Sequence, residues 1–173
     1  MINASDGARD GSSGTIKIIG IGQSLRGDDA AGLAAVHLWK QIYQAGNMHA
    51  DVQVELTELP GLGLLSLLEG SRVAILVDAM HSNSKAGTVR VLTESQLEAF
   101  TTGAGSAHGW GVAETLLLGR KLMSSSLPGT LILIGIEAGQ LNLGETLSPQ
   151  VKSVLPDVAR LIEQSLNIGP HPE

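Results

Sequence analysis

The strongest constraint on the fold is that short apolar runs alternate with helical patterns along most of the chain. The continuous apolar runs at 73–77 and 131–136 are typical of strands that are buried on both faces of a sheet. Further strands are expected at 15–20, 51–57 and 88–92, and helices at 29–44, 61–68, 109–123 and 148–166. This alternation predicts an α/β sandwich around a mostly parallel sheet.

The first and last of these helices carry the clearest sequence signals. In the first, Ala31, Ala35, Leu38 and Ile42 fall on one apolar stripe, with His37 on the opposite face. In the last, Ser148 is the expected N-cap and Pro149 suits the first helical position.

One domain accounts for nearly all of the 173 residues. We expect it to span 15–167, between a disordered polar tail at 1–14 and a short tail at 168–173. The net charge of −6 argues against nucleic acid as a partner. No run of 18 apolar residues is present, which argues against a membrane span, and the polar first residues lack a signal-peptide centre. A cytoplasmic location is therefore expected.

The chain contains no cysteine, which excludes disulfides, thiolate metal ligands and a cysteine nucleophile. Any catalytic chemistry must therefore use carboxylates, imidazoles, hydroxyls or backbone groups.

Acidic residues follow three of the expected strands. Asp28 and Asp29 come after the first strand, while Asp78 and Glu137 end the two buried runs. If those strands are parallel neighbours, the carboxylates gather at one edge of the sheet, where α/β proteins bind their ligands. Clustered like charge is unfavourable unless a cation or a proton compensates it.

The glycine-rich segment at 20–29 lies between a strand and a helix, which raises the question of a phosphate-binding loop. A dinucleotide fingerprint requires a third glycine where Leu25 stands, and the lysine of a Walker loop is also absent. The simpler interpretation is a tight turn, with Asp28 or Asp29 capping the following helix. Capping accounts for one of these aspartates and leaves the other for function.

Asp29, Asp78 and His108 together offer two oxygen donors and one nitrogen donor. This set suits a borderline divalent cation such as zinc, nickel or manganese, and it leaves coordination positions open for water or substrate. An open metal can polarise a carbonyl group or activate a bound water. His81 is a secondary candidate because it follows Asp78 closely.

Four segments, in this order, carry a resemblance to a known family. They are GIGQSLRGDDAAG at 20–32, VAILVDAM at 73–80, SAHGWGVAETLLLG at 106–119 and GIEAGQLNLGETLSPQVKSVLP at 135–156. With them, the chain resembles the maturation endopeptidases of nickel–iron hydrogenases. The resemblance implies a three-layer α/β/α sandwich with a five-stranded sheet. It also implies metal contacts from Asp29, Asp78 and His108, with Asp29 and Asp78 as the catalytic acids.

The same resemblance implies a substrate and a reaction. The partner would be a hydrogenase large-subunit precursor, whose C-terminal extension is removed after nickel has been inserted. Nickel would arrive with the precursor, so no permanently bound cofactor is expected. The departures from the family pattern are Gln23, the pair Ala30 and Ala31, and Ala138 after Glu137. The competing hypotheses are a non-catalytic nickel-binding checkpoint module and a nucleotide-binding domain.

Overall fold

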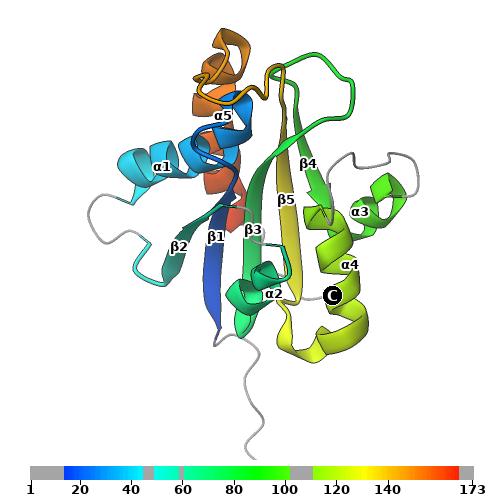
Figure 1. Cartoon of the computed structure of the whole chain (residues 1–173). Helices are drawn as coiled ribbons and strands as arrows, with labels where there is room; N and C mark the ends of the chain where they lie inside the picture. The colour runs from blue at the N-terminus through cyan, green and yellow to red at the C-terminus, as the bar shows by residue number, and fades with distance from the viewer. Residues whose placement is uncertain (1–13, 45–48, 59–60, 102–110, 168–173) are drawn as a thin grey trace, which may run out of the picture.

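The computed structural model describes residues 14–44, 49–58, 61–101 and 111–167 (Figure 1). Its five strands and five helices alternate much as the apolar pattern predicts. The strands are β1 (Thr15–Ile21), β2 (Val52–Thr57), β3 (Ser71–Met80), β4 (Val89–Thr93) and β5 (Thr130–Glu137). The helices are α1 (Ala31–Tyr43), α2 (Gly63–Leu68), α3 (Glu94–Thr101), α4 (Val112–Met123) and α5 (Pro149–Leu166), with short 3-10 turns at Gly27–Ala30 and Ser124–Ser126.

The strands form one sheet in the order β2-β1-β3-β5-β4. Four of them are parallel, and β4 alone runs antiparallel, beside β5. Residues of β3 pair in register with β5, from Val73 opposite Thr130 to Met80 opposite Glu137. This is the mostly parallel, five-stranded α/β fold that the sequence predicts.

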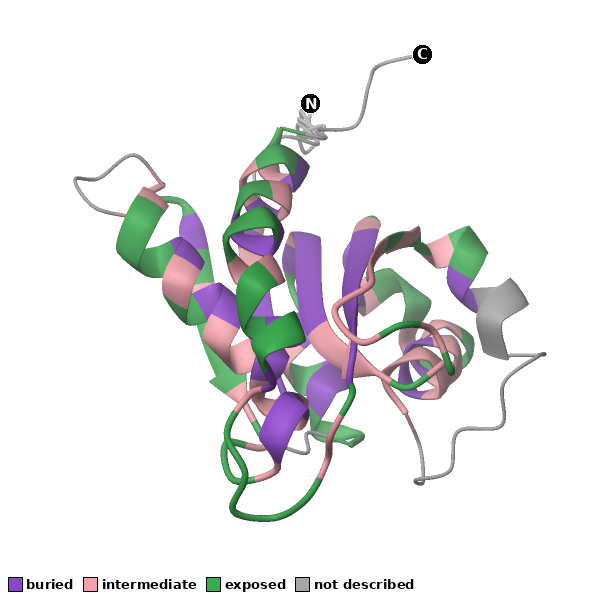
Figure 2. Ribbon diagram, turned by 90° about the horizontal axis from the view of Figure 1, so that it is seen from above, coloured by how far each residue is buried: buried purple, intermediate pink, exposed green. Residues whose placement is uncertain are grey.

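Two helical layers cover the sheet, one on each face, and Figure 2 shows the buried strands between them. On one face α1 and α5 pack on the sheet around Trp39, which is fully buried. On the other face α2, α3 and α4 contribute leucines to a second core that includes Leu64, Leu97 and Leu116. Helices therefore cover both faces of the sheet, so we look for a functional site at the ends of its strands.

The predicted buried stripe of α1 is partly wrong. Ile42 is 51% exposed, whereas Val36 and Trp39 are fully buried. The helix rotates so that the large indole of Trp39 faces the core, and the Trp39 N–H donates to Glu163 Oε2 at 3.0 Å. Burying this ring removes more apolar surface from water than burying Ile42 would. His37 is exposed, as predicted.

Helix α3 has no counterpart in the sequence prediction, although a signal for it is present. Thr93 and Gln96 have the spacing of a capping box, and the Gln96 side chain accepts a hydrogen bond from the Thr93 N–H at 2.9 Å. At the other end of the chain the predicted cap is confirmed, because Ser148 Oγ accepts from the Val151 N–H and Pro149 begins α5.

The predicted tails at 1–14 and 168–173 lie, except for Gly14, outside the residues that the structure describes. Among the helices that it does describe, none has the length and apolar character needed to cross a bilayer.

Candidate active site

The candidate site lies where the chain changes direction across the sheet, between β1 and β3. From β1 the chain continues through α1 on one face, whereas β3 is entered from α2 on the other face. In α/β sheets such a switch point forms a crevice at the carboxyl ends of the two strands. Asp29 follows β1 and Asp78 lies near the end of β3, so both acids belong to this edge.

Close backbone packing places Asp29 at this edge. The Gln23 N–H donates to the Asp29 carbonyl oxygen at 3.3 Å, which closes the turn between β1 and α1. A Cβ on Gly32 would lie 2.2 Å from the Val77 carbonyl oxygen and 2.3 Å from that of Ile21. Only glycine therefore lets the start of α1 rest directly on the ends of β1 and β3.

Asp78 has a strongly raised pKa. Its removal from water and the negative charge of Asp29 raise the pKa of Asp78 to about 7, although a hydrogen bond from the Ala79 N–H opposes the rise. Asp78 forms no ion pair with the residues that the structure describes. Near neutral pH the Asp78 carboxyl group can therefore either hold or release its proton.

Asp28 has a structural role. The sequence predicts that Asp28 or Asp29 caps the following helix, but the N-cap of α1 is Ala30 and this helix end has no side-chain cap, so that prediction is wrong. Its carboxylate is fully buried and accepts hydrogen bonds from the Gly139 N–H at 2.8 Å, the Gln140 N–H at 3.1 Å and the Ser148 N–H at 2.6 Å, and from the Ser148 hydroxyl at 2.9 Å. Burial raises the pKa of Asp28, but these hydrogen bonds outweigh burial and hold it below its ordinary value. Asp28 therefore anchors the loop between β5 and α5.

Glu137 is also structural. It is 1% exposed and accepts from the Ser82 N–H at 2.8 Å, the Ser82 hydroxyl at 2.7 Å and the Ser84 N–H at 3.1 Å. These bonds hold the loop between β3 and β4 against the end of β5. All four strand-end acids thus meet at one edge as the sequence predicts, but two of them serve the loops.

His108, the third predicted ligand, lies outside the described residues. Within 14–44, 49–58, 61–101 and 111–167 no three acidic or histidine side chains are grouped to hold a metal. Helix α4, which follows His108 in sequence, leads into the 3-10 turn Ser124–Ser126 at the opposite sheet edge, where the Ser126 carbonyl oxygen accepts from the Gly70 N–H at 3.1 Å. The N-terminal end of α4 therefore points toward the sheet edge that carries Asp29 and Asp78. His81, the secondary candidate from the sequence, is exposed.

Comparison with known proteins identifies the family. The model of the HycI hydrogenase maturation proteases matches residues 36–165, well over half of the chain. The chain belongs to the hydrogenase maturation proteases. It is therefore a peptidase by family, as the sequence resemblance indicates.

Solved structures of maturation proteases share its fold. The maturating endopeptidase HybD of Escherichia coli is 25% identical with a TM-score of 0.74, over 88% of this chain and 91% of that one. The protease HycI of Thermococcus kodakarensis is 24% identical with a TM-score of 0.65, over 90% of this chain and 94% of that one. No curated protein sequence matches the chain significantly.

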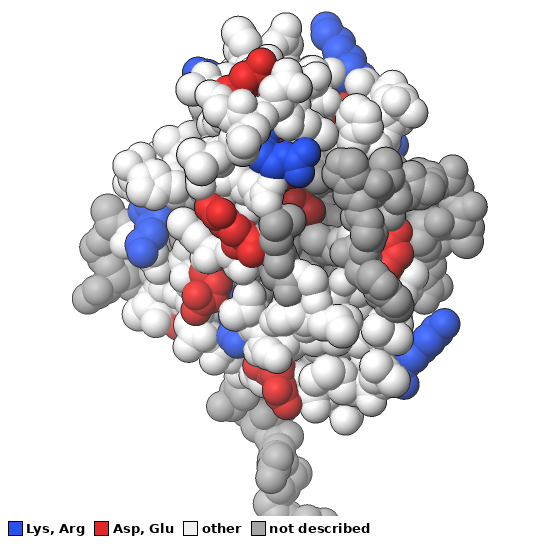
Figure 3. Space-filling view, in the orientation of Figure 1, with Lys and Arg blue, Asp and Glu red and all other residues white. Residues whose placement is uncertain are grey.

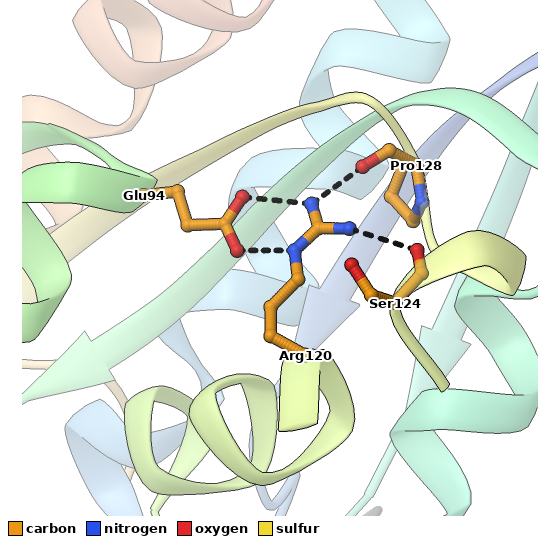
Figure 4. A network of polar contacts seen from close by, with 4 residues as sticks. All are labelled: Glu94, Arg120, Ser124 and Pro128. Carbon is orange, nitrogen blue, oxygen red and sulfur yellow. Dashed lines mark hydrogen bonds and ion pairs between the residues drawn. The ribbon is translucent and has the colours of Figure 1, made fainter. Parts of the chain in front are cut away.

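A polar network in this protease ties together the helices on either side of the segment that contains His108. The guanidinium of Arg120 on α4 donates to both carboxylate oxygens of Glu94, the first residue of α3 (Figure 4). It also donates to the Pro128 carbonyl oxygen at 2.6 Å and to that of Ser124 at 3.4 Å. Both helices are thereby fixed to the connection that enters β5.

Among the described residues on the face that Figure 3 shows, Lys and Arg side chains stand apart from one another and form no broad basic area. This matches the net negative charge of the chain.

Proposed function

We propose that this protease removes the C-terminal extension of a nickel–iron hydrogenase large-subunit precursor after nickel insertion. The observation that carries the proposal is the pair Asp29 and Asp78 at the switch point, where burial and the charge of Asp29 raise the pKa of Asp78. Such a pair is unfavourable for the free protein and is compensated by a cation. Nickel belongs to the substrate here and is brought by the precursor.

The donor set fits this role. Asp29, Asp78 and His108 would supply two oxygens and one nitrogen, a combination that suits nickel. The chain has no cysteine, so any thiolate ligands of the ion belong to the precursor. When bound, the ion supplies Lewis acidity toward the carbonyl group of the scissile bond.

The side chains of the protease have two tasks in this scheme. Asp29 and Asp78 orient the nickel-carrying part of the precursor at the sheet edge. Asp78 has a pKa of about 7, so a carboxylate of the pair can hold or release a proton at neutral pH, as proton transfer in peptide hydrolysis requires. The loop anchored by Asp28 and the start of α1 keep Asp29 in place.

The test is to incubate the protease with nickel-loaded and with nickel-free precursor and to measure the mass of the large subunit. We expect shortening only with the nickel-loaded form. A stable complex of unchanged mass would instead support a non-catalytic checkpoint. Equal shortening of both forms would show that cleavage does not require nickel. Asp157→Asn, at an exposed position of α5, is the matched control and should process normally.

A further inference from the structure

Two leucines near the site are far more exposed than their apolar character favours. Leu25 is 68% exposed and Leu143 is 78% exposed. Single exposed leucines are ordinary on protein surfaces. These two, however, stand on neighbouring loops: Leu25 follows β1 and Leu143 follows β5.

Backbone hydrogen bonds join the two loops into one surface, which we call the leucine platform (residues 23–28 and 139–145). The Gly144 N–H donates to the Leu25 carbonyl oxygen at 2.8 Å, directly beside Leu143. The Gly27 N–H donates to the Glu145 carbonyl oxygen at 3.1 Å. The buried carboxylate of Asp28 also accepts hydrogen bonds from the Gly139 and Gln140 N–H groups, at the start of the second loop. The loops are therefore held in a shape that keeps both leucines in solvent.

The platform is continuous with the candidate site. The Asp29 N–H donates to the Arg26 carbonyl oxygen at 3.1 Å, and the Asp29 carbonyl oxygen accepts from the Gln23 N–H at 3.3 Å. Leu25 thus stands on the same closed turn that carries Asp29. The platform and the candidate site therefore share this turn.

We propose that Leu25 and Leu143 form a docking surface for apolar side chains of the precursor next to its cleavage site. This inference rests on the proposed function, because it takes the partner to be the protein that the site cleaves. Exposed apolar groups held on a rigid frame beside a site are typical of protein-binding surfaces, and a few such residues dominate affinity. A preformed platform also avoids the entropy cost of ordering loops on binding.

The test uses Leu25→Asn, Leu143→Asn and the double variant, with Leu122→Asn as the matched control. Leu122 is 72% exposed, but it stands in the last turn of α4 at the opposite edge of the sheet. All four variants should keep the melting temperature of the wild type, since these side chains are in solvent. Binding of nickel-loaded precursor to immobilised protease and the kinetics of its cleavage are measured separately.

We expect each platform variant to weaken binding of the precursor and to raise KM by about tenfold, and the double variant more, with kcat within about twofold. Leu122→Asn should behave as the wild type. A double variant that binds precursor as tightly as the wild type overturns the docking surface, and so does a wild type that binds none. If the wild-type protease binds the precursor but does not shorten it, the proposed cleavage is wrong. The comparison of binding between wild type and the leucine variants then still tests the docking surface.

Discussion

Asp28 and Ser148 are joined by two hydrogen bonds, one from the Ser148 N–H to Oδ1 at 2.6 Å and one from the Ser148 hydroxyl to Oδ2 at 2.9 Å. The Ser148 Oγ also accepts from the Val151 N–H at 3.3 Å. The N-cap of α5 is therefore held by an acid that lies 120 residues earlier in the sequence. This arrangement explains why two aspartates stand in sequence after β1. Asp28 anchors the loop that precedes α5, which leaves Asp29 for the proposed metal contact.

Asp28→Ala should destabilise the fold by about 3 to 5 kcal/mol, because it leaves three backbone N–H groups and a hydroxyl without their buried acceptor. The free energy of unfolding from urea titration measures this loss. Asp157→Ala, which removes an exposed pair with Arg160, is the control and should change stability by less than about 0.5 kcal/mol. A similar small loss in both variants would contradict the anchoring role of Asp28.

The pKa of Asp28 predicts how this anchor responds to acid. Because its folded pKa is depressed, the carboxylate stabilises the fold fully above its ordinary pKa of 3.8, and the contribution is lost as pH falls through the folded pKa. The stability difference between wild type and Asp28→Ala should therefore be constant near neutrality and shrink only below pH 3.8. A difference that shrinks between pH 5 and 7 would assign the anchor to another group.

Asp78 predicts the opposite trend. Its folded pKa of about 7 lies above the ordinary value of 3.8, so the native state retains a proton that the unfolded chain releases, and stability falls as pH rises between these values. Asp78→Asn should lack this component and be more stable than the wild type at pH 8 by on the order of 2 kcal/mol, while losing activity. Unfolding curves from pH 4 to 8 measure both proteins, and parallel pH profiles would contradict the raised pKa.

Gly32→Ala should cost at least about 2 kcal/mol and reduce activity, because the new methyl group would collide with backbone oxygens of β1 and β3 and push α1 off the sheet. Gly63→Ala is the matched control. Nothing lies within 4 Å of the place that its new methyl group would take, and it stands in α2, so it should stabilise the protein by about 0.5 to 1 kcal/mol. Thermal unfolding and the processing assay distinguish the two.

The sequence predicts the strands and most helices because their apolar runs are long and strongly patterned. It misses α3, where the Thr93 and Gln96 capping box is the only strong local signal. It also misjudges the buried face of α1, since the rotation of that helix depends on Trp39 reaching Glu163 on α5, a contact 124 residues away in sequence.

For the site, the sequence correctly gathers four acids at one edge but cannot sort them. Asp28 and Glu137 become structural only because loops fold back and present N–H groups to them, Gly139 to the first and Ser82 to the second. Those contacts depend on tertiary structure. The roles of Asp29, Asp78 and His108 as metal contacts stay predictions.

The central claim is that Asp29 and Asp78 act as one unit on the nickel-loaded precursor. The most direct measurement is a double-mutant cycle on the single-turnover rate of precursor shortening, with Asp29→Asn, Asp78→Asn and the double variant. If both acids serve one ion, each single variant should lose nearly as much rate as the double variant, at least about a hundredfold. Small losses that simply add, or wild-type rates in either single variant, would contradict the account.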